Sequence, residues 1–197
     1  MPDSKRIGLL GGSFNPAHEG HLHISRVALD RLGLDEVWWV VSPQNPLKPA
    51  TGMASFAERM MRARAFAGSE PRIVISDVER ELDTRYTIDT LRALRTRFPE
   101  RKFVFLMGAD NFIQLPQWRD WSAIVRTVPI AIFPRPSYSY RALTGRAAKR
   151  FARFRLPDIG AHRLADQRAP AWAFVRSAPD TSSATRIRQR LGKPTTR

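Results

Sequence analysis

Two histidines three residues apart, His18 and His21, are the side chains whose type and spacing most readily suit chemistry in this sequence. They follow the run Gly11-Gly12-Ser13-Phe14, which comes after a strand-like apolar segment and before a helical pattern. Glycines let the backbone approach an anion closely, and the N–H groups of a helix start point toward it. Both imidazoles would lie on one face of the first helical turn. The spacing therefore predicts a phosphate site with two histidines aimed at one ligand.

Neither of the common phosphate motifs is present, because the chain has no Gly-x-Gly-x-x-Gly and no Gly-Lys-Ser/Thr. A zinc site is the alternative for two close histidines. Zinc needs a third and usually a fourth ligand, and beyond the carboxylates only His23 and His162 remain in a chain without cysteine. We therefore expect no metal held by side chains, and we interpret His23 as a histidine without a chemical role.

The chain is strongly basic, because it has 33 lysines and arginines and only 18 acidic residues, which gives a net charge of +15. Such a field attracts polyanions, among which nucleic acids and phosphorylated small molecules are both candidates. No apolar run approaches the length of about 18 residues that a membrane span needs, and the amino terminus lacks a leader-like apolar region. We expect a cytoplasmic protein with no membrane partner; the sequence does not indicate an oligomeric state.

Strand-like and helical patterns alternate along the chain. The continuous apolar run at 37–41 is typical of a parallel strand that is covered on both faces. Alternation of this kind predicts an α/β, doubly wound, Rossmann-like parallel sheet of five or six strands with helices on both faces, in a single domain over 1–197. The predicted strands are 6–10, 37–41, 72–76, 103–107, 128–133 and 171–175, and the predicted helices are 19–32, 55–68, 87–98 and 183–191.

A basic insert at about 138–167 interrupts this order. The stretch 135–168 around it holds nine basic residues and two acids. Four apolar residues fall at helical spacing and predict that part of the insert is an amphipathic helix with a basic outer face: Leu143, Ala147, Phe151 and Phe154. A core-packing stripe under a solvated face is the favoured interpretation, and a nucleic-acid-binding surface is the alternative.

Two motifs resemble those of a known superfamily. His18 to His21 is similar to the His-x-Gly-His signature of one nucleotidyltransferase superfamily, and Ser183 to Arg188 resembles its second motif, Ser-x-Thr-x-Ile-Arg. Within that superfamily, the bacterial nicotinate mononucleotide adenylyltransferases are the most similar. The supporting stretches are Tyr86-Thr87 with Thr90-Leu91, Gly108 with Asp110, the later Trp118, and Arg135-Pro136.

The resemblance implies a reaction in which the AMP part of ATP joins nicotinic acid mononucleotide and pyrophosphate leaves. It implies Mg²⁺ held through the phosphates of ATP rather than by side chains. His18 and His21 would be catalytic. The implied ATP-binding residues are Gly11, Gly12, Ser13, Phe14, Gly108, Asp110, Arg135, Ser183, Thr185 and Arg188, and those for the acceptor nucleotide are Asn45, Lys48, Tyr86, Thr87, Trp118 and Arg119.

Ordinary structural roles remain open for several of these residues. Asp110 and the pair Tyr86-Thr87 could be plain helix caps, Ser183 could cap the last helix, and Trp118 could be core packing. Another acceptor, such as phosphopantetheine, or CTP as donor would suit the same superfamily. A basic nucleic-acid-binding protein is the rival from a different class; we consider nucleic acid an unlikely partner and expect small-molecule substrates.

Overall fold

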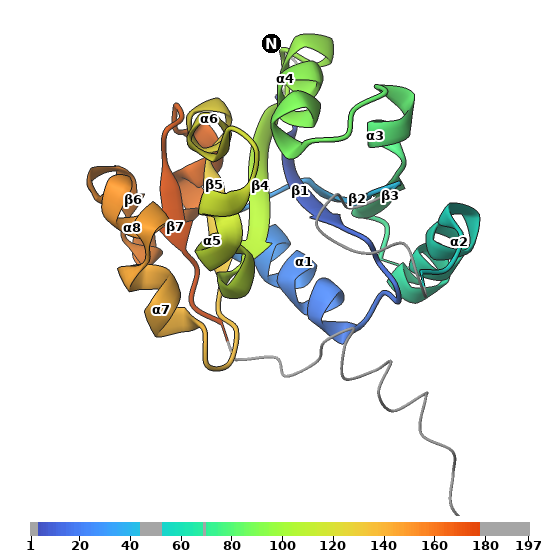
Figure 1. The fold of residues 1–197 in the computed structure, drawn as a ribbon, viewed down its shortest axis with the longest axis horizontal. Helices are drawn as coiled ribbons and strands as arrows, with labels where there is room; N and C mark the ends of the chain where they lie inside the picture. The colour runs from blue at the N-terminus through green and yellow to red at the C-terminus, as the bar shows by residue number, and fades with distance from the viewer. Residues whose placement is uncertain (1–3, 44–52, 69, 178–197) are drawn as a thin grey trace, which may run out of the picture.

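The structure, a computed structural model, describes residues 4–43, 53–68 and 70–177, so the predicted helix at 183–191 lies outside the described residues. Its centre is one parallel sheet with the strand order β3-β2-β1-β4-β5-β7-β6 (Figure 1). The strands are β1 (Arg6–Gly12), β2 (Glu36–Val41), β3 (Ile73–Ser76), β4 (Lys102–Gly108), β5 (Ile130–Phe133), β6 (Arg155–Leu156) and β7 (Trp172–Phe174).

The predicted α/β class and all six predicted strands are confirmed, but the predicted number of strands is one too low. The strand that the sequence did not reveal is β6, whose two residues pair with Trp172 and Ala173 of β7 and are too few to carry a pattern. The fifth strand begins at Ile130 rather than at Val128. Val128 still donates its N–H to Ile124 of the preceding helix, and the next residue, Pro129, has no N–H.

Strict alternation along the strands supplies the two faces of the sheet. Leu10 and Trp39 point into one apolar core, and Leu9 and Trp38 point into the other. The first core is covered by α1 (Glu19–Arg31), α2 (Phe56–Ala67) and the 3₁₀ helix η3 (Asp158–Asp166). The second is covered by α3 (Val78–Glu81), α4 (Thr87–Arg97), α5 (Ala109–Gln114), α6 (Trp121–Thr127), α7 (Ser139–Thr144) and α8 (Arg146–Arg150), with the turn η1 (Leu115–Gln117). The sheet is therefore doubly wound, as predicted.

The strand order reverses between β1 and β4. From β1 the chain extends the sheet through β2 to β3, and from β4 it extends the other way through β5. In open α/β sheets, ligands bind beyond the carboxyl ends of the strands at such a reversal. This geometry points to the loops after Gly12 and Gly108.

The helical prediction for the basic insert is confirmed only in part. Leu143, Ala147, Phe151 and Phe154 do pack on the second core, but on separate elements. Gly145, with an extended backbone, is both the C-cap residue of α7 and the N-cap residue of α8, so the helix is interrupted there. The 3₁₀ helix η2 (Ala152–Phe154) then connects α8 to β6. Figure 1 shows these elements beside β7 and β6, at the edge of the sheet opposite α2 and β3.

Both acids of the insert are paired with basic residues outside it. Asp166 accepts hydrogen bonds from Lys102 Nζ at 2.8 Å and from Arg6 Nη2 at 2.9 Å, and these two partners lower the pKa of its carboxyl. Asp158 lies 3.0 Å from Arg31 Nη2. The acids therefore hold η3 against the sheet, and their charge is already balanced there.

No helix among residues 4–43, 53–68 and 70–177 is both long and apolar enough to cross a membrane.

Gly8 of β1 provides a test of how tightly the first core is packed. A Cβ at this position would lie 2.7 Å from Leu34 Cδ1 and 2.8 Å from Leu106 Cδ1, whereas a Cβ at Gly11 would meet nothing closer than 3.8 Å. We expect Gly8→Ala to lower the free energy of unfolding by about 1–3 kcal/mol through overpacking. Gly11→Ala is the matched control and should change it by less than about 0.5 kcal/mol. Equal effects in urea titrations would contradict this description of the core.

Candidate active site

The turn after β1 is built around Phe14. Its backbone adopts φ = +46°, which is uncommon for a residue other than glycine, and its side chain is 1% exposed. The ring stacks on Trp39 with centroids 5.1 Å apart and lies 4.6 Å from the ring of His21. The side chain of Phe14 therefore supports His21, and only its backbone is placed to face a ligand. Ser13 is buried as well, whereas Gly11 is exposed.

His18 and His21 cap helix α1 reciprocally. His18 is the N-cap residue, and its Nδ1 accepts the N–H of Gly20 at 3.1 Å. The Nδ1 of His21 accepts the N–H of His18, also at 3.1 Å, and the two ring centroids are 3.9 Å apart. This is a capping box in which imidazoles replace the usual Ser/Thr and Glu/Gln pair. The structure thus brings the two predicted histidines together at the loop after β1.

The capping bonds determine where each neutral ring carries its proton. A neutral imidazole has one N–H donor and one acceptor nitrogen. Because Nδ1 is the acceptor in both His18 and His21, we assign the proton to Nε2 in both rings. Each Nε2–H is then a hydrogen-bond donor, which suits an anionic oxygen and not a cation. This tautomer argues against a metal at the pair, and it agrees with a phosphate site.

A buried hydrogen-bond relay fixes the first turn of α1 on the sheet. Trp39 Nε1 donates to Ser25 Oγ at 2.8 Å, and Ser25 Oγ donates to the carbonyl of His21 at 2.8 Å. Both Trp39 and Ser25 are fully buried. The strand β2 therefore sets the position of His21, and Trp39 is a core residue.

Arg59 of α2 connects the loops that surround this turn. The residue is 1% exposed, and its guanidinium donates to four backbone carbonyls. The acceptors are Ser13 at 2.8 Å, Ser42 at 2.7 Å, Pro43 at 2.8 Å and Ala54 at 3.1 Å. Burial lowers the pKa of Arg59. This role has no local signal in the sequence, because three of the four carbonyls, those of Ser13, Ser42 and Pro43, lie 16 or more residues from Arg59.

Gly108, Asp110 and Arg135 meet at the carboxyl ends of β4 and β5. Arg135 Nε lies 3.8 Å from Asp110 Oδ1, and both side chains are partly buried. A Cβ at Gly108 would collide with Asp110 Oδ1 and lie 3.2 Å from Arg135 Nε, so any larger residue there would displace the Asp110 side chain. These three predicted residues are thus brought together. Gly108 is the N-cap residue of α5 and Asp110 is its second helical residue, so Asp110 does not occupy the cap position.

Four of the six residues predicted for the acceptor nucleotide form a second group at the same edge: Tyr86, Thr87, Trp118 and Arg119. The guanidinium of Arg119 lies over the ring of Tyr86 at 4.5 Å, so the segment after η1 is beside the start of α4. Tyr86 is the N-cap residue of α4 and Thr87 is the first helical residue; no side chain caps that end. Trp118 packs edge-on against Phe105 at 6.4 Å, and its Nε1 is buried with no partner in the described residues. Trp118 therefore has a core contact and a polar atom that remains to be satisfied.

Glu79 of α3 is a site residue that the sequence did not reveal. Its Oε1 accepts the hydroxyl of Thr90 at 3.4 Å, and its carboxylate is also hydrogen-bonded to Ser42. Its Oε2 is buried and has no partner among the described residues. Burial is the largest effect on this group and raises the pKa of Glu79. The carboxylate thus connects Ser42, just after β2, with Thr90 of α4.

Five predicted site residues lie outside the described residues: Asn45, Lys48, Ser183, Thr185 and Arg188. Their roles stay predictions. His23 Nε2 lies 3.3 Å from Ser177 Oγ. No group of three or more His, Asp or Glu side chains in the described part of the chain is arranged to hold a metal ion.

A doubly wound α/β fold, a glycine turn and a histidine-capped helix at the strand reversal define a nucleotidyltransferase class of protein. The chain belongs to the cytidylyltransferase-like family, which it matches over residues 9–190.

Curated relatives indicate which member of this family the chain resembles. The chain is 54% identical to a protein of Parvibaculum lavamentivorans over 187 residues, which covers 95% of this chain and 92% of that one. It is 49% identical to a protein of Caulobacter sp. over 95% of this chain and 99% of the relative. Both are named probable nicotinate-nucleotide adenylyltransferase.

The fold is also similar to that of a solved structure of the Plasmodium falciparum nicotinic acid mononucleotide adenylyltransferase. The TM-score is 0.72 at 18% identity, and the match covers 96% of this chain and 85% of that one. At this identity the likeness supports the fold alone.

Removing the Arg59 guanidinium should leave four carbonyls without their donor. We expect Arg59→Met to lower the free energy of unfolding by roughly 3 kcal/mol or more, because hydrogen bonds from charged donors are worth about 1.5–3 kcal/mol each. The control is Arg62→Met on the same helix, where an exposed pair with Glu58 should contribute less than about 1 kcal/mol. If the two variants unfold at the same urea concentration, Arg59 does not hold these loops.

Glu79 should make stability depend on pH in a defined direction. Because its pKa is raised in the folded chain, the stability that it contributes is present below its ordinary pKa of 4.5 and is lost as pH rises through the raised value. We therefore expect Glu79→Gln to gain stability relative to the wild type as pH increases from 4.5 to 7. Chemical unfolding of both proteins across this range measures the difference. A difference that stays constant with pH would show that Glu79 titrates normally.

Proposed function

We propose that this chain transfers the adenylyl group of ATP to nicotinic acid mononucleotide, giving nicotinic acid adenine dinucleotide and pyrophosphate, a step of NAD synthesis. The observation that carries the proposal is the reciprocal capping of His18 and His21, which presents two Nε2–H donors where β1 ends. The names of the relatives at about half identity support the same activity. ATP and nicotinic acid mononucleotide are then the small-molecule substrates, and the cytoplasm is the compartment that we propose.

The reaction requires a phosphate oxygen of the acceptor to attack the α-phosphorus of ATP while pyrophosphate leaves. Catalysis of this kind depends on positioning and on stabilising charge in the transition state. His18 and His21 would donate from Nε2 to the phosphate oxygens on which charge develops. Their caps fix the rings before substrate arrives, so little reorganisation is needed. No covalent intermediate with the enzyme is required.

The remaining predicted residues divide between the two nucleotides. Gly11, Gly12 and the backbone of Phe14 would lie along the triphosphate, and Gly108 with Asp110 and Arg135 would bind the adenosine side. Ser183, Thr185 and Arg188 would hold the leaving pyrophosphate. Mg²⁺ would be held by the phosphate oxygens of ATP and supply further charge neutralisation there.

On the acceptor side, Tyr86, Thr87, Trp118 and Arg119 would hold the nicotinate ring. Trp118 offers an aromatic face and a buried N–H that still lacks a partner in the described structure. The start of α4 offers backbone N–H donors to a carboxylate. Asn45 and Lys48 would contact the acceptor from the loop after β2.

Product identification tests the function directly. The purified chain is incubated with ATP and Mg²⁺ and with either nicotinic acid mononucleotide or phosphopantetheine, and CTP replaces ATP in a parallel series. We expect nicotinic acid adenine dinucleotide by mass spectrometry from the first pair and little product from the others. A faster reaction with phosphopantetheine or with CTP would assign the chain to another activity of the same family.

The two roles of His21 can be separated by substitution. Asparagine places Oδ1 near the position of Nδ1, so His21→Asn should keep the cap and lose only the Nε2–H donor. We expect turnover to fall about 10²–10³-fold, with little change in stability. His21→Ala should lose the same turnover and in addition about 1 kcal/mol of stability with the cap. A folded His21→Asn protein with near-native turnover would end the phosphate-donor role.

The acceptor site should prefer the acid, nicotinic acid mononucleotide, over its amide. A carboxylate accepts hydrogen bonds with both oxygens, whereas an amide would turn an NH₂ group toward the donors at the start of α4. Such a mismatch costs about 1–3 kcal/mol, or roughly tenfold to a hundredfold in kcat/KM. The ratio of kcat/KM for the two mononucleotides at fixed ATP measures it. Equal values would show that Tyr86, Thr87 and Trp118 do not recognise the carboxylate.

A further inference from the structure

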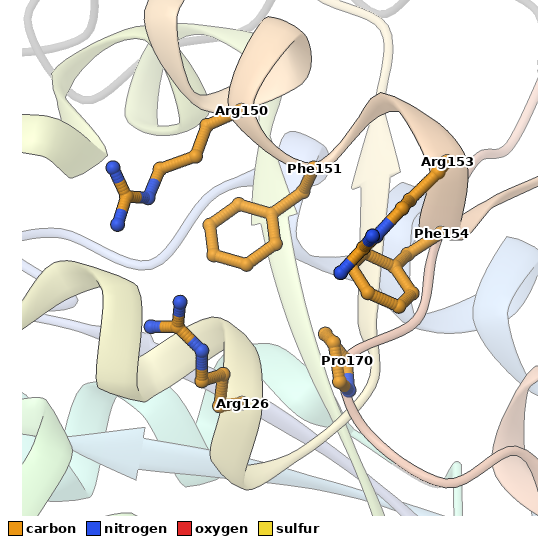
Figure 2. Close-up of a pocket in the computed structure, with 6 residues that line it drawn as sticks. All are labelled: Arg126, Arg150, Phe151, Arg153, Phe154 and Pro170. Carbon is orange, nitrogen blue, oxygen red and sulfur yellow. The ribbon is translucent and has the colours of Figure 1, made fainter.

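A cluster of positive charge lies where the basic insert packs against α6, away from the candidate active site. Three arginines surround a cavity of about 360 Å³ that is also lined by Phe151, Phe154 and Pro170 (Figure 2). Arg126 comes from the last turn of α6, Arg150 from the end of α8 and Arg153 from η2.

The location of this cavity follows from the connectivity. Helix α6 ends shortly before β5 begins, η2 directly precedes β6, and Pro170 lies two residues before β7. These strands are parallel, so all three segments lie at the amino-terminal edge of the sheet. His18, Gly108 and Arg135 lie at or just beyond the carboxyl ends of their strands. The two sites are therefore on opposite edges.

Aromatic rings hold the three guanidinium groups in place. Arg126 lies over the ring of Phe151 at 5.4 Å, and Arg153 lies over the ring of Phe154 at 4.6 Å. Arg150 lies over Trp121 at 5.6 Å. In Figure 2, Arg126 and Arg150 lie on one side of the Phe151 ring, and Arg153 lies against Phe154 on the other. A guanidinium that lies over an aromatic ring can still donate from its N–H groups to an acceptor.

These positive charges have no carboxylate to balance them in the described part of the chain. Among the described residues, Arg126, Arg150 and Arg153 form no ion pair, and Arg126 Nη1 donates to the carbonyl of Ser122 at 3.2 Å. The two acids of the insert are already paired elsewhere, with Arg31 and with Arg6 and Lys102. Three like charges around one cavity repel one another, and a bound anion would offset that repulsion.

We propose that this cavity binds the phosphate groups of a small phosphorylated molecule, at a site separate from catalysis. Planar guanidinium forks bind two phosphate oxygens at once, which suits a ligand with two or more phosphates. The cavity volume lies at the small end of the range for small-molecule sites, about 300–1,000 Å³. Phe154 and Pro170 give it an apolar wall for the rest of such a ligand. Convergence on one cavity favours a small ligand over the extended backbone of a nucleic acid.

Calorimetric titration of the full chain with inorganic tripolyphosphate at about 0.15 M salt tests the proposal, because exposed charges alone are largely screened there. We expect the triple variant R126Q/R150Q/R153Q to lose one binding site per chain, or to bind there at least about tenfold more weakly. The variant R64Q/R92Q/R163Q removes the same charge from three exposed helix positions and should lose no site. The KM for ATP should remain within about twofold in both variants, because neither touches the active site.

Further titrations distinguish the effect of guanidinium geometry from that of charge, and identify which phosphate ligand binds best. The variant R126K/R150K/R153K keeps the charge but not the planar forks, and it should bind tripolyphosphate at least several-fold more weakly than the wild type. Titrations with pyrophosphate and with ATP show whether a free oligophosphate or a nucleotide fits better. The proposal would be overturned if both glutamine variants lost tripolyphosphate binding equally, or if the lysine variant kept full affinity. It would also be overturned if the wild-type chain bound an oligonucleotide but did not bind tripolyphosphate.

Discussion

The candidate active site depends on two hydrogen bonds in which imidazole nitrogens cap a helix. Gly20 donates to His18, and His18 donates to His21, so both Nδ1 atoms are committed to the backbone. Most helix caps satisfy N–H groups and do nothing else. Here the same bonds select the tautomer and the orientation of two side chains. The turn that ends β1 therefore stabilises α1 and fixes the orientation of both imidazoles with one set of contacts.

The rest of the structure keeps this turn in place from two directions. From the core, Trp39 and Ser25 hold the carbonyl of His21, and the ring of Phe14 packs against both Trp39 and the imidazole of His21. From the side, Arg59 binds carbonyls of the loops that follow β1 and β2. Because one buried guanidinium donates to both loops, a shift of either loop would break hydrogen bonds to Arg59. Glu79 extends the connection from the end of β2 to α4, where the acceptor is expected to bind.

The sequence predicted those parts of the molecule whose signal is local. Periodicity located six strands and the helices α1, α2 and α4, and the spacing of His18 and His21 placed both at one helix start. The short helices α3, α5 and α6 were not predicted. Glycine at Gly108 was predicted as part of a motif, and its reason, close contact with Asp110 and Arg135, is visible only in three dimensions. Arg59 and Glu79 could not be predicted, because their partners come from separated segments. The strand β6 and the break at Gly145 were missed because each involves only one or two residues, too few for a periodic pattern.

The tautomer of the two histidines is the central claim, since both the phosphate site and the proposed chemistry rest on it. Long-range ¹H–¹⁵N correlation spectra of the chain with ¹⁵N-labelled histidine distinguish an Nε2–H ring from an Nδ1–H ring and from imidazolium. Assignment through His18→Asn and His21→Asn identifies the two signals. At neutral pH we expect both rings to be neutral with the proton on Nε2. An Nδ1–H ring at either position would contradict the capping bonds and the account of the site that is built on them.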